Sequence, residues 1–270
     1  MKKVKDKTKR SVLFKFLIAL TFVGMVTVNA LANILPLNGI GTGAVSDSYP
    51  NLFAPTGLTF AIWGLIYLLL ALSTLYQLGL FRGNEKEDVT LMRKVGFMFA
   101  VSSLTNAAWI FAWHYNRIAL SLILMVLLLL YLIDIVVNIN AKALTTREKW
   151  FLRLPFSVYF GWITVATIAN ATTLLVSVGW DRFGLSESTW TFIMLAVGAL
   201  IGLITTLRYK DIAYGLVLIW AYTGILIKHL SPTGFGGQYR GVILMLIVCL
   251  VLFAATVIYI LINQRKKLRS

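Results

Sequence analysis

The sequence predicts an all-α fold, a polytopic bundle of eight transmembrane helices. Of its residues, 59% are hydrophobic and only 13% are charged, and the mean hydropathy is +0.83. The charges avoid a series of apolar runs, each close to the ~20 residues that a helix needs to cross a bilayer. These runs cover residues 16–35, 58–81, 95–113, 118–139, 154–178, 189–207, 212–227 and 241–262. The seventh run is marginal in length, but the series as a whole predicts eight spans.

The basic residues predict the orientation of these spans. With the N-terminus in the cytoplasm, all but four of the 25 Lys and Arg residues fall on the cytoplasmic side. The exceptions are Arg117, Arg182, Lys228 and Arg240. Cytoplasmic loops are enriched in Lys and Arg, so we expect both termini in the cytoplasm of an integral protein of a bacterial cytoplasmic membrane. The net charge of +15 then follows from topology, adds attraction to anionic membrane lipids, and predicts no nucleic-acid partner.

The first run has an alternative interpretation as a signal peptide. A basic stretch at 2–15 precedes an apolar run and the small-residue motif Ala30-Leu31-Ala32, which is typical of a cleavage site. Cleavage would leave seven spans. The apolar run continues through Ile34 and Leu35, which favours an uncleaved helix.

Ionisable residues within the runs are scarce. Asp134 lies one helical turn before Asn138, where either snorkelling to the interface or an i,i+4 hydrogen bond is expected. His114 and His229 fall at outer helix ends and are expected to be solvated there, and Cys249 is expected to be a buried hydrophobe. No nucleophile with a base, paired carboxylates or metal-type cluster is apparent. The sequence therefore predicts no catalytic residue, cofactor or metal.

Uncharged polar and aromatic residues within the runs indicate a ligand pocket. Counted from the outer ends of their runs, Trp63 lies ~8 Å deep, and Asn106 and Asn170 lie ~12 Å deep. Trp162 and Trp220 are too far inside their runs to be interfacial anchors. Stiff rings and a few amides at one depth are what a pocket for a flat hydrophobic ligand needs.

Small residues recur at helix-packing spacing. Gly96 is followed by Ala100, and Gly198 by Gly202, which allows close approach of two helices. Packing within the bundle is the expected use, with a homodimer as the alternative.

The outer loop 36–57 is expected to consist of turns and not of helix. It contains Gly39, Gly41, Gly43, Pro50 and Pro55. Its apolar side chains either cover an outward-facing pocket or rest at the interface, and both interpretations stay open.

Three motifs in order give a family resemblance. They are Pro55-Thr-Gly-Leu-Thr-Phe-Ala-Ile-Trp63-Gly-Leu-Ile-Tyr67, Asn106-Ala-Ala-Trp109 and Trp162-x3-Ala166-x3-Asn170. Together they resemble the TspO/MBR family, the tryptophan-rich sensory or translocator proteins. The resemblance implies a five-helix bundle over 16–178, and the three additional transmembrane helices predicted over 189–262 lie outside it. Basic cytoplasmic segments, 1–15 and 263–270, flank these helices.

The resemblance also implies a function. Known members bind porphyrins, and some bind sterols, so we expect a hydrophobic ligand of tetrapyrrole, sterol or isoprenoid type, for sensing, sequestration or transport. The ligand-binding residues implied by position are Trp63, Tyr67, Asn106, Trp109, Trp162, Ala166 and Asn170. Some members are linked to light-dependent porphyrin breakdown, so enzyme activity is left open. The loop departs from the family pattern, because it lacks tryptophan and has Ala54-Pro55 where a Pro-Pro pair is usual.

The alternative function is a secondary transporter of a small metabolite. Eight spans that include a marginal, glycine-containing helix resemble transporter construction. A transporter of that kind predicts an internal repeat, but the Trp and Asn pattern of the earlier runs does not recur in the last three.

Overall fold

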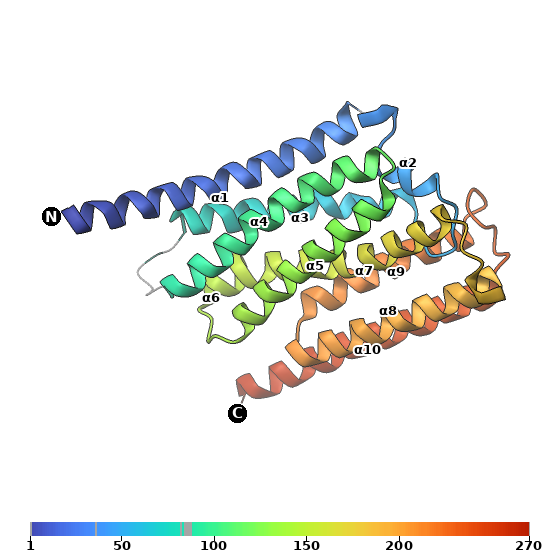
Figure 1. Cartoon of the computed structure of the whole chain (residues 1–270). Helices are drawn as coiled ribbons and strands as arrows, with labels where there is room; N and C mark the ends of the chain where they lie inside the picture. The colour runs from blue at the N-terminus through green and yellow to red at the C-terminus, as the bar shows by residue number, and fades with distance from the viewer. Residues whose placement is uncertain (1, 36, 82, 84–87, 270) are drawn as a thin grey trace. The chain divides into compact units, whose positions relative to one another are not determined.

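The computed structural model describes residues 2–35, 37–81, 83 and 88–269, with side chains from residue 12 to 266 within those ranges. Figure 1 shows helices joined by short connections, and the described ranges contain no strand. The long helices are α1 (Lys2–Ile34), α3 (Ile62–Leu78), α4 (Val89–His114), α5 (Ile118–Asn140), α7 (Leu154–Ser177), α8 (Glu187–Tyr209), α9 (Ile212–Leu230) and α10 (Arg240–Arg269). The short elements are η1 (Leu37–Gly39), α2 (Thr42–Asp47), η2 (Gly57–Ala61), α6 (Thr146–Glu148), η3 (Lys149–Arg153) and η4 (Arg182–Gly184). The all-α prediction is confirmed.

Eight segments of the described chain are long and apolar enough to cross a membrane, which confirms the predicted number of spans. They are Val12–Ile34, Gly57–Leu78, Val89–His114, Ile118–Asn140, Thr146–Ser177, Glu187–Tyr209, Ile212–Leu230 and Arg240–Lys266. The marginal seventh run is a helix of 19 residues. The protein is an integral membrane protein.

The loop 36–57 contains more helix than the sequence predicted. A six-residue helix, α2, forms at Thr42–Asp47, although turns alone were expected there. Six residues are too few to show a helical periodicity against the surrounding glycines, which is why the pattern did not reveal it.

Polar side chains cap several helices. Asp88 accepts hydrogen bonds from the backbone N–H groups of Thr90 and Leu91 at the start of α4, both at 3.0 Å. Ser186 caps α8 and Asp211 caps α9 in the same way. Each cap satisfies a backbone donor that the first helical turn leaves without a partner.

The chain divides into two compact units. The first comprises Met1–Thr42 and Gly64–Phe156, and the second comprises Gly43–Trp63 and Ser157–Ser270. The first therefore holds α1, α4, α5 and most of α3, while the second holds α8, α9, α10, most of α7 and most of the outer loop. The boundary after residue 178 that the family resemblance implies stays a prediction.

In the first unit, α4 packs against both α1 and α5. A Cβ on Gly96 of α4 would lie 2.5 Å from Ile18 Cδ1 of α1, so the glycine permits this close approach. In the second unit, α10 packs against α8 and α9. A Cβ on Gly198 would lie 2.6 Å from Tyr222 Oη, and one on Gly202 would lie 2.5 Å from Leu218 Cδ1. Gly96, Gly198 and Gly202 therefore serve packing between helices of the same unit, as predicted.

The acid predicted within a run, Asp134, is both paired and partly exposed. Asn138 Nδ2 donates to Asp134 Oδ1 at 3.0 Å, which is the i,i+4 hydrogen bond. Lys94 Nζ lies 3.4 Å from the same oxygen, and the Asp134 side chain is 38% exposed. The carboxylate is thus part of a local polar group shared by α4 and α5.

Candidate functional site

Two of the predicted ligand residues, Trp63 and Trp162, lie in contact within the second unit. Their ring centroids are 6.2 Å apart and the rings meet edge to face. Phe60 lies 5.9 Å from Trp162, and Tyr159 lies 6.1 Å from Trp63, both also edge to face. Edge-to-face contact is the favoured geometry for aromatic pairs, so these four residues, which we call the tryptophan cluster, form one aromatic surface.

The tryptophan cluster contains a polar donor without a partner. Trp162 is 3% exposed, and its Nε1 has no acceptor in the part of the chain that the structure describes. Buried N–H groups are nearly always hydrogen-bonded, and an exception needs an explanation such as a water or a ligand. The indole N–H of Trp162 is therefore available to an acceptor on a bound molecule.

Ala166 and Asn170 extend the face of α7 that carries Trp162. The three residues are spaced by four, which places them on one side of a helix. Asn170 is 2% exposed, and Ala166 is half-buried. From Trp162 toward the C-terminal end of α7, this face presents an aromatic ring, a small side chain and an amide.

The other three predicted ligand residues belong to the first unit. Asn106 is fully buried, and its Oδ1 accepts a hydrogen bond from Asn29 Nδ2 at 2.7 Å. Trp109 stacks on Trp113 with a centroid distance of 6.0 Å, and Tyr67 is half-buried on α3. For these three residues, contact with a ligand stays a prediction from the resemblance.

A residue that sequence reasoning misjudged, His114, holds the start of the outer loop to α4 in the first unit. Its side chain is fully buried, so the predicted solvated position is wrong. Its Nδ1 lies 3.1 Å from Leu37 O, and its Nε2 lies 2.9 Å from Thr42 Oγ1. Since a carbonyl can only accept, Nδ1 donates to Leu37 O, while Nε2 is hydrogen-bonded to the Thr42 hydroxyl.

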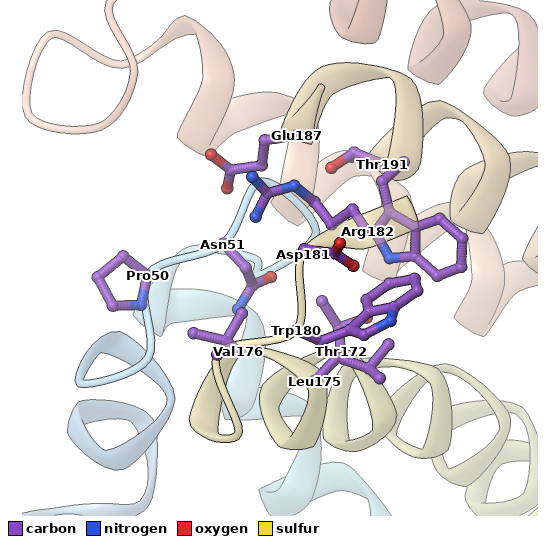
Figure 2. Close-up of a pocket in the computed structure, with 12 residues that line it drawn as sticks. Pro50, Asn51, Thr172, Leu175, Val176, Trp180, Asp181, Arg182, Glu187 and Thr191 are labelled. Carbon is purple, nitrogen blue, oxygen red and sulfur yellow. The ribbon is translucent and has the colours of Figure 1, made fainter. Parts of the chain in front are cut away.

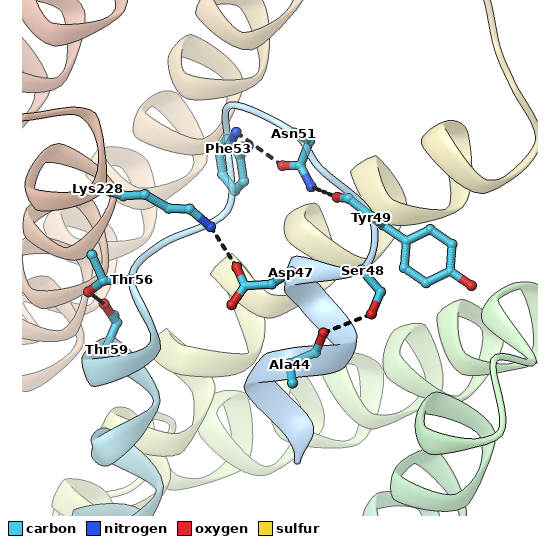
Figure 3. A network of polar contacts seen from close by, with 9 residues as sticks. All are labelled: Ala44, Asp47, Ser48, Tyr49, Asn51, Phe53, Thr56, Thr59 and Lys228. Atoms are coloured by element: carbon cyan, nitrogen blue, oxygen red, sulfur yellow. Dashed lines mark hydrogen bonds and ion pairs between the residues drawn. The ribbon is translucent and has the colours of Figure 1, made fainter. Parts of the chain in front are cut away.

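In the second unit the outer loop is fastened by its own hydrogen bonds and by α9. Figure 3 shows the Asn51 amide between Tyr49 and Phe53, where it donates to Tyr49 O at 2.8 Å and accepts from Phe53 N at 3.1 Å. Lys228 of α9 forms an ion pair of 2.7 Å with Asp47. These contacts give the loop a defined path.

Three other residues of α9 form hydrogen bonds with the loop and with η2. His229 Nε2 donates to Leu52 O at 2.9 Å, the Thr56 backbone N–H donates to Gly224 O at 3.2 Å, and Trp220 Nε1 donates to Thr59 O at 2.9 Å. His229 is fully buried, which overturns its predicted solvated position as well. The sequence placed Trp220 deep within its apolar run, but it did not indicate the hydrogen-bond partner, Thr59, which is 161 residues away in the sequence. No local pattern could have revealed these roles, because each depends on a distant carbonyl.

A cavity of about 310 Å³, which we call the outer cavity after its predicted side of the membrane, lies at the C-terminal end of α7, between the loop and the start of α8. Figure 2 shows the polar groups of Asn51, Arg182 and Glu187 around it, with Thr172, Leu175 and Trp180. Trp190 also lines it, 4.6 Å from Trp180 between ring centroids, and the Trp190 Nε1 is buried without an acceptor in the described chain. This outer cavity offers both signs of charge beside aromatic rings, and the seven predicted ligand residues lie outside its lining.

The described ranges contain no cluster of side chains of the metal-binding types. Among the residues that they cover, no group of three or more His, Cys, Asp and Glu side chains is arranged to hold an ion. Cys249 is 1% exposed on α10, in the buried position expected of it. The candidate site is therefore one of rings, amides and N–H donors.

These features define a class, the polytopic α-helical membrane proteins that carry a tryptophan cluster with an asparagine on the same helix face. A family model described as TSPO-like protein matches residues 15–262. The chain belongs to this TSPO-like family. The match includes α8, α9 and α10, which lie beyond the motifs that carry the sequence resemblance. No curated protein and no solved structure gives a significant match.

Proposed function

We propose that the protein binds a flat, hydrophobic small molecule of the tetrapyrrole, sterol or isoprenoid type at the tryptophan cluster, for sensing, sequestration or transport. The observation that carries the proposal is the edge-to-face contact of the half-buried Trp63 with the buried Trp162, whose indole N–H has no acceptor in the described chain. A ligand with a planar apolar body and an oxygen or nitrogen acceptor would meet both needs.

The surroundings of the cluster support this ligand class. Phe60 and Tyr159 add apolar ring surface, and Asn170 supplies an amide two turns along the same face of α7 from Trp162. Desolvating a charged ligand in the membrane is costly, whereas a lipophilic one carries no such penalty. Within unit 2 the hydrogen bonds from α9 hold η2, and with it Phe60, in place beside Trp162.

The test is a porphyrin titration of the purified protein, followed through the porphyrin's own absorbance so that the signal does not depend on the tryptophans. We expect Trp162→Leu and Trp63→Leu to weaken binding about fivefold or more, since an aromatic pair contact contributes about 1 kcal/mol. Trp162→Phe keeps a six-membered aromatic ring but removes the five-membered ring with its N–H, so it shows how much of the loss in Trp162→Leu comes from losing the aromatic ring altogether. Sterols and isoprenoids are then tested as competitors of the bound porphyrin.

Trp190→Leu is the matched control. Trp190 also makes an edge-to-face contact, with Trp180, and also has a buried Nε1 without an acceptor in the described chain. It lies outside the tryptophan cluster, so its loss should leave porphyrin affinity unchanged. Equal losses for Trp190→Leu and Trp162→Leu, or failure of all three ligand classes to bind, would refute the proposal.

The second candidate function is secondary transport of a small metabolite. The outer cavity favours it, because Arg182 and Glu187 bring opposite charges to one small hollow. Uptake of a small zwitterion by proteoliposomes, abolished by Glu187→Gln but not by Trp162→Leu, would support this function over the first.

A further inference from the structure

A second cavity lies between the C-terminal ends of α8 and α10, within the second unit. Its volume is about 510 Å³. The lining consists of Leu207, Lys210, Tyr259, Ile260, Asn263, Gln264 and Lys266. Gln264 Nε2 donates to Lys210 O at 3.5 Å, a weak bond that links the two helix ends. We call this cavity the α8–α10 groove.

The groove is lined by positive charge without a negative counterpart. Lys210 and Lys266 are exposed, and neither forms an ion pair with a carboxylate of the described chain. The lining contains no Asp or Glu, and Asn263 and Gln264 add amide donors. Two ammonium groups and two amides around one hollow are suited to an anion with several oxygen acceptors.

The remaining lining residues are apolar and belong to the membrane spans. Leu207 is 45% exposed and Tyr259 is 60% exposed, both on the apolar stretches of α8 and α10. The polar residues of the groove lie at the C-terminal ends of these two spans, where polar side chains are expected at the headgroup level. A molecule that fills the groove must therefore combine an anionic head with an apolar tail.

We infer that the α8–α10 groove binds an anionic phospholipid, with the phosphate between Lys210 and Lys266 and an acyl chain along Leu207 and Tyr259. Basic pockets between transmembrane helices are suited to such headgroups. This inference is independent of the tryptophan cluster and of the ligand proposed there. It differs from general attraction to a basic surface, because neighbouring cations outside the groove should not contribute equally.

Arg208 and Arg265 provide the matched control. They lie on the same two helix ends as the lysines but are not part of the groove lining. The Arg208 guanidinium instead lies 5.6 Å from the centre of the Tyr209 ring. The pair Arg208→Gln with Arg265→Gln removes the same charge as Lys210→Gln with Lys266→Gln. Comparing the two double variants therefore distinguishes lipid binding in the groove from general electrostatic attraction to a basic surface.

The experiment measures binding of phosphatidylglycerol to the full chain in detergent by native mass spectrometry, with phosphatidylcholine as the zwitterionic comparison. A basic residue near an anionic surface contributes enough for about a fivefold change, so each lysine variant alone should weaken binding about fivefold and the double variant about 30-fold. The double arginine variant should keep the affinity of the unaltered protein. Equal losses in both double variants, or equal binding of the two lipids, would overturn the inference.

Competition distinguishes a lipid from a free phosphate. Glycerol phosphate has the head chemistry but no acyl chain, so at millimolar concentration it should not displace phosphatidylglycerol. Displacement would assign the groove to a soluble phosphate compound instead. The single variants keep the test decisive if the double lysine variant fails to fold, because each changes one exposed side chain.

Discussion

At the scale of single residues, Gly224 marks a close approach between α9 and η2. A Cβ at this position would overlap Thr59 Oγ1 and would lie 2.7 Å from Thr59 Cγ2 and 2.8 Å from Thr59 Cβ. The side chain of Thr59 is 2% exposed and has little room to move away. The glycine is thus required by packing, although it lowers the helix propensity of a marginal span.

Gly224→Ala should therefore destabilise the protein by about 1–3 kcal/mol, the usual cost of overpacking a core. The free energy of unfolding in detergent, measured by a denaturant titration, gives the comparison. Gly64→Ala is the control, because a Cβ at Gly64 meets nothing within 4 Å, and it should be neutral or slightly stabilising. A Gly224→Ala variant as stable as the unaltered protein would contradict the close approach.

Asp88 illustrates an interaction of surface charge with a helix end. The hydrogen bond from Lys142 and the backbone N–H of Leu91 hold the pKa of this carboxyl below its ordinary value of 3.8. A lowered pKa in the folded state means that the stabilisation is present above pH 3.8 and is lost as the pH falls through the folded pKa. We expect Lys142→Gln to raise the pKa of Asp88 toward its ordinary value. A carboxyl titration by NMR measures this, and an unchanged pKa would exclude Lys142 as the main cause.

At the scale of elements, α9 depends on Asp211 at its N-terminus. Asp211 is 6% exposed, accepts a hydrogen bond from the Tyr214 backbone N–H at 3.1 Å and accepts another from Ser157 Oγ of α7. The same carboxylate thus caps one helix and joins it to a second. This places the start of α9, whose other end holds the outer loop.

Asp211→Ala should cost about 2 kcal/mol or more, because it removes a cap worth about 1 kcal/mol and leaves the buried Ser157 hydroxyl without its acceptor. Asp211→Asn keeps an acceptor oxygen and a good capping residue, so its loss should be clearly smaller. The free energy of unfolding in detergent, measured for both variants by a denaturant titration, gives the comparison. If Asn costs as much as Ala, the negative charge and not the hydrogen-bond geometry would be responsible.

At the scale of the whole molecule, the basic residues predict the topology of the eight helices. Single cysteines introduced in a Cys249→Ala background can report it, since Cys249 is buried and contributes no exposed thiol. Cysteines at positions 117 and 182 should react with a membrane-impermeant reagent from the outside, and those at 147 and 210 only from the cytoplasm. Reaction of position 117 from the cytoplasmic side alone would reverse the topology.

The sequence predicted the spans well because hydrophobic length and charge distribution are local quantities that the bilayer itself imposes. The family motifs also singled out Trp63 and Trp162, which the structure brings into contact, while the shared depth of Trp63 and the predicted amides stays a prediction. The two histidines were misjudged, because burial at a helix end depends on a loop folding back over it. Helix α2 was not predicted, because its six residues are too few to show a helical periodicity of apolar residues.

By itself, then, the sequence determined an integral membrane protein with eight helical spans and indicated the family through its tryptophan and asparagine motifs. Only the tertiary structure decided which residues touch one another. It showed that Trp162 lacks an acceptor within the described chain, that α9 holds η2 through Trp220 and the outer loop through His229, and that Lys210 and Lys266 line one groove. The physical reason is the distance along the sequence over which each interaction acts. Partition of a segment into the bilayer depends on the residues of that segment alone. Hydrogen bonds and ring contacts, in contrast, join residues that are distant in sequence and become adjacent only after packing.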